Sequence, residues 1–597
     1  GCSAASLRMR YSRSHLPIAE AVLTWVWATA LSGTTLTVYS RWHESMIQYS
    51  LLDEPVISVV ERTTQTRRQL TLPGVYAALA SDDIEDFPAL RPHQRHVWHA
   101  FLVQVAALYL HRTGQSELPR DEGSWRSALL SLTPNDTDGA AWALISPPER
   151  PAFLQPPVAS GSLAGFKTIT TPDDLDMLVT AKNHDVKRRS MRDARAEHWM
   201  FALLSLQTQE GFLGAGNYGI SRMNGGFASR PSVGIAPSGA IGRRFSRDAS
   251  RLIALRGRLL EEYNFYPANG GHALLWLLAW DGGQSISPKE LDLFFVEICR
   301  RVRIGLSANG RIHAVTTGTK ASRIDARSLK GRTGDGWTPL MADGESRKGL
   351  TINAESLSYK KLVPILFPRS SDSGSPFRAP LQDISTADDQ SGLSVLARGI
   401  VRGQGKTQGY RERRVPVSAA VRRFMIERPS DTCAAIANDR ILDASTVARK
   451  VLYPAVLTIF TAAPLDGERK RDDDSAKART SRVLGLFDRR VDQTFFEALA
   501  EEVEVHDNVN AAIEVRSRWL RALLEHARDL LDQCAAAAPS AAMRGYRTRA
   551  RARDVLEFGF LRHFKERLVD VQPQTDNMLA EATAPDSRRT SAEEPGP

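Results

Sequence analysis

The sequence predicts an α+β fold, with a mixed α/β amino-terminal domain followed by a carboxy-terminal helical bundle. Three observations lead to this prediction. The 597 residues exceed what one hydrophobic core normally supports, so more than one domain is expected. Up to about Arg414, strand-like alternation and helical periodicity are separated by turn-rich stretches. After that residue, apolar side chains recur every three or four positions, as they do in packed helices.

The first 45 residues differ from the sequence that follows. Residues 16–38 are largely apolar and follow several arginines, as in a signal peptide or a membrane anchor. Glu20 interrupts this apolar run, and an alternation typical of a first strand starts only after Met46. We therefore expect residues 1–45 to be an apolar upstream extension of the folded protein.

The remaining chain divides into three segments by composition. Residues 46–412 are expected to form the α/β domain, and residues 413–570 the helical bundle. Residues 571–597 have few large apolar side chains and much Pro, Ser, Thr, Asp and Glu, so burial cannot offset the entropy of ordering them. We expect this last segment to be a disordered tail.

Strands, helices and loops are expected to follow one another in the α/β domain. A strand is expected at residues 56–61, an amphipathic helix at 97–110, and a further helix, from helical periodicity, at 197–209. Five prolines punctuate a loop around Phe153. Glycines end the second helix at residues 211–226, and a strand-like run covers residues 393–402.

Two apolar stripes with helical spacing predict the bundle. The first comprises Leu484, Phe487, Val491, Phe495, Leu499 and Val503, and the second comprises Leu520, Leu524, Ala527, Leu531 and Cys534.

Charge and cysteine content limit the classes of function. A net charge of +10 and a pI near 9.5 favour acidic partners, so nucleic acid and anionic membrane both fit, as does plain solvation of many arginines. The four cysteines are far apart and form no C-x-x-C pair, which predicts neither a disulfide framework nor a zinc finger. This pattern suits a reducing cytoplasm.

Gly214, Gly216 and Gly219 formally match the dinucleotide-binding pattern G-x-G-x-x-G. A dinucleotide site needs a strand before the glycines and a helix after them, whereas here the predicted helix comes first. Position 239, where a ribose-binding acid would be expected, is Gly239. The pattern therefore does not indicate a Rossmann site.

The same glycines allow a second interpretation. Residues without Cβ let a backbone come close to a nucleic-acid groove or a phosphate, and Arg222, Asn224 and Arg230 could supply donors nearby. A structural turn that ends the helix is the alternative.

Residues 403–407 read GQGKT, which resembles the end of a phosphate-binding P-loop. The glycine required five residues before Gly405 is replaced by Ile400, so the register fails. A P-loop-like nucleotide-binding enzyme remains the alternative function. In the other interpretation, Gln404, Lys406 and Gln408 are polar side chains on a tip that reaches bases or phosphates, or simply lies in solvent.

Other clusters of polar residues give weaker signals. His93, His96 and His99 share the spacing of one helical stripe, but no carboxylate stands at a ligand spacing, so a partly exposed helix face is expected rather than a metal site. Arginines 544, 547 and 551 lie on one side of a predicted helix and could face phosphates or solvent. No nucleophile, base or paired-carboxylate signature predicts catalysis.

The order of several segments resembles the CasA family, the large subunit of the type I-E CRISPR Cascade surveillance complex. The segments are SLLDEPVISV (50–59), PAFLQ (151–155), EGFLGAGNYGISRMNGGF (210–227), GDGWTPL (334–340), RGQGKTQGYRERRVP (402–416) and DRRVDQTFFEAL (488–499). The resemblance implies an α/β domain followed by a four-helix bundle, without catalytic activity, cofactor or metal. It also implies a subunit that recognises the motif flanking the target (PAM) in double-stranded DNA.

The resemblance further implies roles for three loops. Gly214, Gly216 and Asn217 would form the glycine loop that approaches the minor groove of the flanking duplex. Phe153 and the loop after it would lie near the guide RNA. A wedge that starts strand separation would comprise Gln404, Lys406, Thr407 and Gln408.

The implied partners are CRISPR RNA, double-stranded target DNA, the other Cascade subunits and a helicase-nuclease recruited after recognition. No membrane partner is implied, and the protein would be cytoplasmic.

Overall fold

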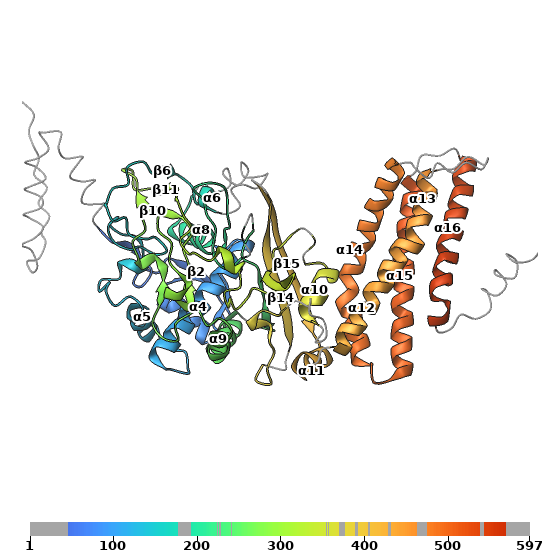
Figure 1. Ribbon diagram of the computed structural model, residues 1–597, viewed down its shortest axis with the longest axis horizontal. Coiled ribbons are helices and arrows are strands. Elements are labelled where there is room, and N and C mark those ends of the chain that lie inside the picture. The colour runs from blue at the N-terminus through green and yellow to red at the C-terminus, as the bar shows by residue number, and fades with distance from the viewer. Residues whose placement is uncertain are drawn as a thin grey trace, which may run out of the picture.

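The computed structural model describes most of the chain between residues 46 and 568. The described residues are 46–176, 191, 193–223, 225, 228–239, 241–353, 355, 357–368, 377–388, 392–403, 406–427, 431–461, 474–537 and 542–568. The predicted extension at residues 1–45 and the predicted tail at residues 571–597 lie outside them. A rounded α/β part and an elongated array of helices stand at opposite ends of the molecule, with a long hairpin between them (Figure 1).

A small antiparallel sheet opens the α/β part. The strand predicted at residues 56–61 is β2 (Ile57–Glu61), which pairs on one side with β3 (Arg67–Leu70) and on the other with β4 (Ile84–Asp86). Thr71 caps the following helix, α3 (Leu72–Ala80), by accepting a hydrogen bond from the backbone N–H of Gly74.

Helix α4 (Arg95–Thr113) lies at the centre of the first hydrophobic core. The sequence predicts a helix here, which is confirmed, but the predicted amphipathic character is wrong. Every residue from His96 to Leu110 is buried, because α8 (Ala196–Gln209), α9 (Ile241–Glu262) and β9 (Leu291–Val296) pack against the helix. A helix enclosed by its neighbours shows no polar stripe.

Shorter elements complete the α/β part. Further strands in the described residues of this part are β1 (Gln48–Ser50), β5 (Ala143–Ile145), β6 (Lys167–Ile169), β8 (His272–Leu274), β10 (Arg301–Leu306), β11 (Ile312–Thr317), β12 (Leu340–Asp343) and β13 (Ser346–Gly349). Among the residues that the structure describes, α5 (Glu122–Ser131) and α6 (Pro172–Leu175) also belong to this part. Strand β11 lies between β10 and β6, and β1 pairs with β5.

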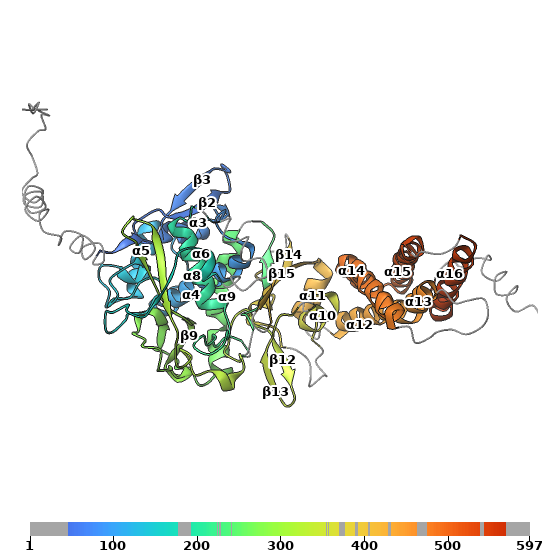
Figure 2. The same cartoon turned by 90° about the horizontal axis from the view of Figure 1, so that it is seen from above.

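Two long strands, β14 (Leu393–Gly403) and β15 (Lys406–Val417), form the hairpin between the two parts of the molecule (Figure 2). Strand β7 (Ser232–Pro237) pairs with the other edge of β14, so the sheet order is β15-β14-β7. The hairpin contributes to the second hydrophobic core, together with α10 (Tyr359–Leu366) and the carboxy-terminal helices. The strand β15 crosses residue 412, where the sequence places a domain boundary.

The carboxy-terminal helices form the predicted bundle. In the part of the chain that the structure describes, four long helical segments surround its core: α12 (Asp431–Thr446) continued by a π-helical stretch and α13 (Tyr453–Thr461), then α14 (Asp474–Glu504), α15 (Val509–Ala537) and α16 (Ala542–Phe564). Helix α13 packs against α14 and α16, and α15 packs against the same two. The shorter α11 (Ala419–Glu427) connects the hairpin to the bundle. Both predicted stripes, on α14 and α15, face this core.

No helix within the described parts of the chain is long and apolar enough to cross a membrane. The apolar run at residues 16–38 lies outside those parts.

Candidate nucleic-acid interface

The glycine loop begins where α8 ends. At Glu210 the backbone leaves the helical conformation. Glu210 then forms an antiparallel β-bridge with Ser229, which closes the loop at its base. The hydroxyl of Ser229 donates to the carbonyl of Ile400 on β14 at 2.6 Å. Both ends of the loop are therefore fixed, and one of them is attached to the hairpin.

A tight turn forms the tip of the loop. The Asn217 N–H donates to the carbonyl of Gly214 at 3.0 Å, and the Leu213 N–H donates to the carbonyl of Asn217 at 2.9 Å. Gly214 has φ of +112° and Gly216 has φ of +82°, a backbone region that L side chains rarely adopt. A Cβ added at Gly214 would meet no atom within 4 Å, so this position faces open space.

The far side of the turn is held by the protein. The Thr319 N–H donates to the carbonyl of Gly216 at 3.0 Å, and the Arg300 guanidinium donates to the carbonyls of Gly211 and Tyr218. These bonds leave the Gly214 side of the turn open and hold the other side. A preformed turn of this kind can approach a groove without losing conformational entropy on binding.

The end of β14 next to the hairpin turn is attached to the base of the loop through Arg402 and Glu210. Thr407 is buried, and its hydroxyl accepts a hydrogen bond from Arg402 at 3.3 Å, so it holds the hairpin rather than facing a partner. Gln408 is exposed. Lys406 pairs in register with Gly403 next to the turn, and Gln404 lies outside the described residues.

A buried ionic contact joins the two loops. The Glu210 carboxylate lies 3.3 Å from the Arg300 guanidinium and 3.4 Å from that of Arg402, and all three side chains are at most 4% exposed. Burial lowers the pKa of Arg402, and the Glu210 carboxylate opposes this effect. The Glu210 carboxylate thus contacts both Arg300, which donates to carbonyls of the loop, and Arg402, which lies on the hairpin strand β14.

The prediction that Arg222 and Arg230 supply donors to DNA is wrong. Arg222 and Arg230 are almost fully buried, the first lying over the Phe295 ring and the second bound to Asp335 at 2.6 Å. Burial alone would lower the pKa of Arg230, but Asp335 outweighs it and the net shift is upward. Both arginines support the base of the loop from within the core. Asn224 lies outside the described residues.

Phe153 occupies an interior position. Its ring is fully buried and contacts the rings of Phe101 and Trp276, with centroids 5.4 and 6.0 Å away. Gln155, also fully buried, donates to the carbonyl of Leu144. This segment is a packed part of the core, and a guide-proximal role for the loop after it stays a prediction.

The GQGKT segment does not have the context of a P-loop. That motif requires a helix directly after its lysine, because the helix amino terminus supplies part of the phosphate site. Here β15 begins at Lys406 and runs as a strand to Val417. The geometry therefore does not support the alternative of a P-loop-like enzyme.

The three histidines form separate buried contacts. His93 bonds to Asp176 at 2.8 Å, His96 to Gln209 at 2.6 Å and His99 to Asp248 at 2.8 Å. The expectation of a partly exposed helix face is wrong, because all three are buried. Within the described residues, no group of three His, Cys, Asp or Glu side chains could hold a metal ion.

Two of the described cysteines lie in the interior of the protein. Cys299 and Cys433 are buried free thiols, and burial raises the pKa of each to about 12. These thiols are inert at neutral pH. Arg547 and Arg551 are exposed on α16, so a phosphate-facing stripe and a solvated face both stay open there.

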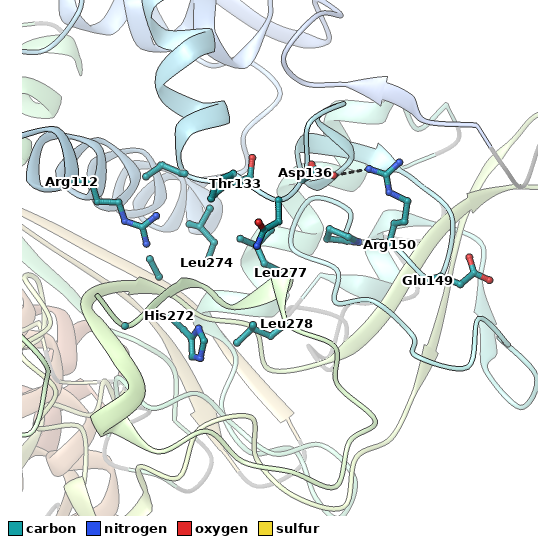
Figure 3. Close-up of a pocket in the computed structure, with 15 residues that line it drawn as sticks. Arg112, Thr133, Asp136, Glu149, Arg150, His272, Leu274, Leu277 and Leu278 are labelled. Carbon is teal, nitrogen blue, oxygen red and sulfur yellow. Dashed lines mark hydrogen bonds and ion pairs between the residues drawn. The ribbon is translucent and has the colours of Figure 1, made fainter. Parts of the chain in front are cut away.

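A pocket of about 540 Å³ lies between the α5 end and residues 271–278. Figure 3 shows Arg150 turned toward Asp136, to which it bonds at 2.8 Å; Arg150 also pairs with Asp138. These pairs raise the pKa of Arg150 further above its ordinary value. Its charge is satisfied within the protein, and no nucleophile and base stand together in the pocket lining.

Sequence reasoning did not find Glu210, Arg300 and Arg402, which hold the interface together. The available signal was a charged residue at the end of an apolar run, since Glu210 follows α8 and Arg402 ends the apolar part of β14. Such residues must be paired when they are buried.

The fold is shared with solved structures. Cse1 from Acidimicrobium ferrooxidans superposes with a TM-score of 0.55 at 16% identity, covering 86% of this chain and 99% of that one. Thermus thermophilus CasA (Cse1) gives 0.56 at 15% identity over 87% and 99%, and Thermobifida fusca Cse1 gives 0.53 at 12% identity over 86% and 98%. The chain therefore has the Cse1/CasA fold. Scans of family models and of curated protein sequences find no match.

Proposed function

We propose that this chain, which has the Cse1/CasA fold, is the non-catalytic large subunit of a type I-E CRISPR Cascade complex. In this role it recognises the motif flanking the target in double-stranded DNA and starts strand separation. Its partners are CRISPR RNA, the target duplex, the other Cascade subunits and a helicase-nuclease, and it acts in the cytoplasm. The fold and the segment order in the sequence support this proposal.

The contact of Glu210 with both Arg300 and Arg402 is the observation that carries the proposal. A subunit that reads a flanking motif and opens the adjacent base pairs needs its reading loop and its separating loop in a fixed relation. In a rigid pair of loops, correct seating of the first positions the second. Backbone carbonyls and small residues suit a minor groove, whose pattern of donors and acceptors is degenerate.

One side of the loop tip is open enough to approach a DNA minor groove. Gly214 faces open space, Ala215 is exposed, and Asn217 is partly exposed beside them. An amide side chain can both donate and accept hydrogen bonds at base edges. We propose that these three residues enter the groove, and that Gln408, which is exposed beyond the buried Thr407, acts at the separating strands.

The experiment assembles the complex with its guide RNA and measures equilibrium binding to a matched target duplex. The variant Gly214→Leu adds a side chain into open space, so it blocks approach of a groove while leaving the packing intact. Gly344→Leu is the control, because Gly344 also has a positive φ, of +62°, and also faces open space. We expect target binding to be lost in the first variant and kept in the second.

Retained target binding by a folded Gly214→Leu complex would overturn the assignment of the loop. Thermal unfolding of the purified variants checks that both carry the same small cost of placing an L residue at positive φ, about 1 kcal/mol. Loss of binding in both variants would likewise contradict a specific role for this turn.

A further inference from the structure

A second cavity, of about 220 Å³, opens where α4, α9, β7 and the hairpin strands meet. Its cationic lining residues come from four different elements and are Arg95 on α4, Arg244 on α9, Arg398 on β14 and Arg414 on β15. Its apolar wall includes Phe87, Trp98, Pro237 and Phe245. This cavity is separate from the glycine loop, and none of the functions proposed above uses it.

Arg244 is the unusual member of the set. Its side chain is 9% exposed, and its Nε and Nη2 atoms are buried without a hydrogen-bond partner. The nearest carboxylate, that of Asp248, is 3.7 Å away and already bonds to Arg247 at 2.9 Å and to His99 at 2.8 Å. A buried guanidinium with unmet donors is costly unless an anion completes its bonding.

The acidic groups near the cavity are largely engaged with other arginines. Asp86 binds Arg95 at 2.5 Å, and Glu412 lies 3.1 Å from Arg398. Glu85 is exposed at the rim. Burial lowers the pKa of Arg244 against the effect of Asp248, and Arg398 and the exposed Arg414 lower it further.

The indole N–H of Trp98 is also buried without a hydrogen-bond partner, and Trp98 lines the same cavity. The unmet groups on these two residues are therefore all donors. A cavity lined by unmet donors binds hydrogen-bond acceptors. The amino terminus of α9 (Ile241–Glu262), which is the positive end of the helix dipole, also lies at this cavity. There Asp82 accepts a hydrogen bond from the backbone N–H of Arg243.

We propose that this cavity binds a phosphate group, with Arg244 at its buried end and Arg414 at its mouth. The guanidinium groups of Arg244, Arg398 and Arg414 belong to three different elements that line the cavity. A carboxylate offers two oxygens in one plane, whereas a phosphate offers three or more oxygens arranged around one centre. The aromatic and apolar wall fits a phosphate that is carried on an organic body.

The test uses the purified full chain and calorimetric titration with inorganic phosphate, adenosine monophosphate and adenosine. Arg414→Gln removes the charge at the mouth on an exposed side chain, and Arg244→Gln removes the buried one. Arg547→Gln is the control, because it removes an equal charge from an exposed position on α16. Circular dichroism and thermal unfolding verify that each variant is folded.

We expect both phosphate compounds to bind, adenosine not to bind, and Arg414→Gln to weaken phosphate binding about tenfold, as for loss of one charge-assisted hydrogen bond. Adenosine monophosphate binding at least about tenfold more tightly than inorganic phosphate identifies an organic phosphate as the occupant, and equal affinities identify free phosphate. Absence of phosphate binding, binding of adenosine, or equal weakening by Arg547→Gln overturns the proposal. If Arg244→Gln does not fold, the Arg414→Gln comparison decides alone.

Discussion

Glu210 contacts Arg402 across 3.4 Å, and through this ion pair the residue that starts the glycine loop holds the strand that leads to the hairpin tip. Because the same carboxylate also lies 3.3 Å from Arg300, it compensates two buried positive charges. Its removal should therefore affect the stability of the protein and the relation of the two loops together.

Glu210→Ala should lower the free energy of unfolding by about 3–5 kcal/mol, since it removes the buried carboxylate that contacts both Arg300 and Arg402. Chemical denaturation monitored by circular dichroism measures this change. Glu501→Ala is the control, because Glu501 is 56% exposed and pairs with an exposed arginine, Arg518, so its loss should cost less than about 1 kcal/mol. Equal losses in the free energy of unfolding would show that the buried contact stabilises the protein no more than an exposed ion pair does.

Two glycines of the same loop should respond differently to alanine. At Gly219 a Cβ would lie 2.7 Å from the backbone N of Phe212, so Gly219→Ala must displace backbone and should cost about 2 kcal/mol or more. At Gly214 only the positive φ opposes the change, and the cost should be about 1 kcal/mol. Thermal unfolding of both variants tests the order, and a larger loss at Gly214 would contradict the loop geometry.

Local patterns predicted part of this arrangement. The helices α8, α14 and α15 follow from apolar spacing, and the end of α8 follows from the glycines after it. The roles of Arg222 and Arg230 could not be predicted, because only folding brings their partners near. Asp335, which pairs with Arg230, is distant from it in sequence. A charged residue looks the same in a sequence whether it faces a phosphate or a buried carboxylate.

Acid should destabilise the protein partly through His99. Burial, followed by Arg244, lowers the pKa of His99 to about 4 against the effect of Asp248, while the unfolded chain has the ordinary value near 6.5. The unfolded state therefore binds the proton more readily, and the stability that is present above pH 6.5 falls by about 3 kcal/mol as pH decreases to about 4.

His99→Gln keeps a donor toward Asp248 and removes the titrating ring, so the slope of stability against pH between 4 and 6.5 should become smaller. Denaturant midpoints measured across this range check the prediction. His563→Gln, at an exposed position, is measured in the same way as the control. An unchanged slope in His99→Gln would mean that this imidazole does not carry the effect.

The protein should bind no ATP through its GQGKT segment, because β15 follows Lys406 where a phosphate site would need a helix. Titration with a fluorescent ATP analogue, in the presence of Mg²⁺, should give no saturable signal that depends on Lys406. Saturable binding to the unmodified chain that disappears in Lys406→Ala would contradict this interpretation and favour a nucleotide-binding enzyme.

The most direct test of the proposed function changes the bases that flank the target while the guide and its complementary strand stay the same. In the assembled complex, dissociation constants are measured for duplexes that carry every flanking trinucleotide, at one salt concentration. We expect a preferred set of flanks, bound at least about tenfold more tightly than the rest. Equal affinity for all flanks, in a complex that still pairs with its complementary strand, would contradict it.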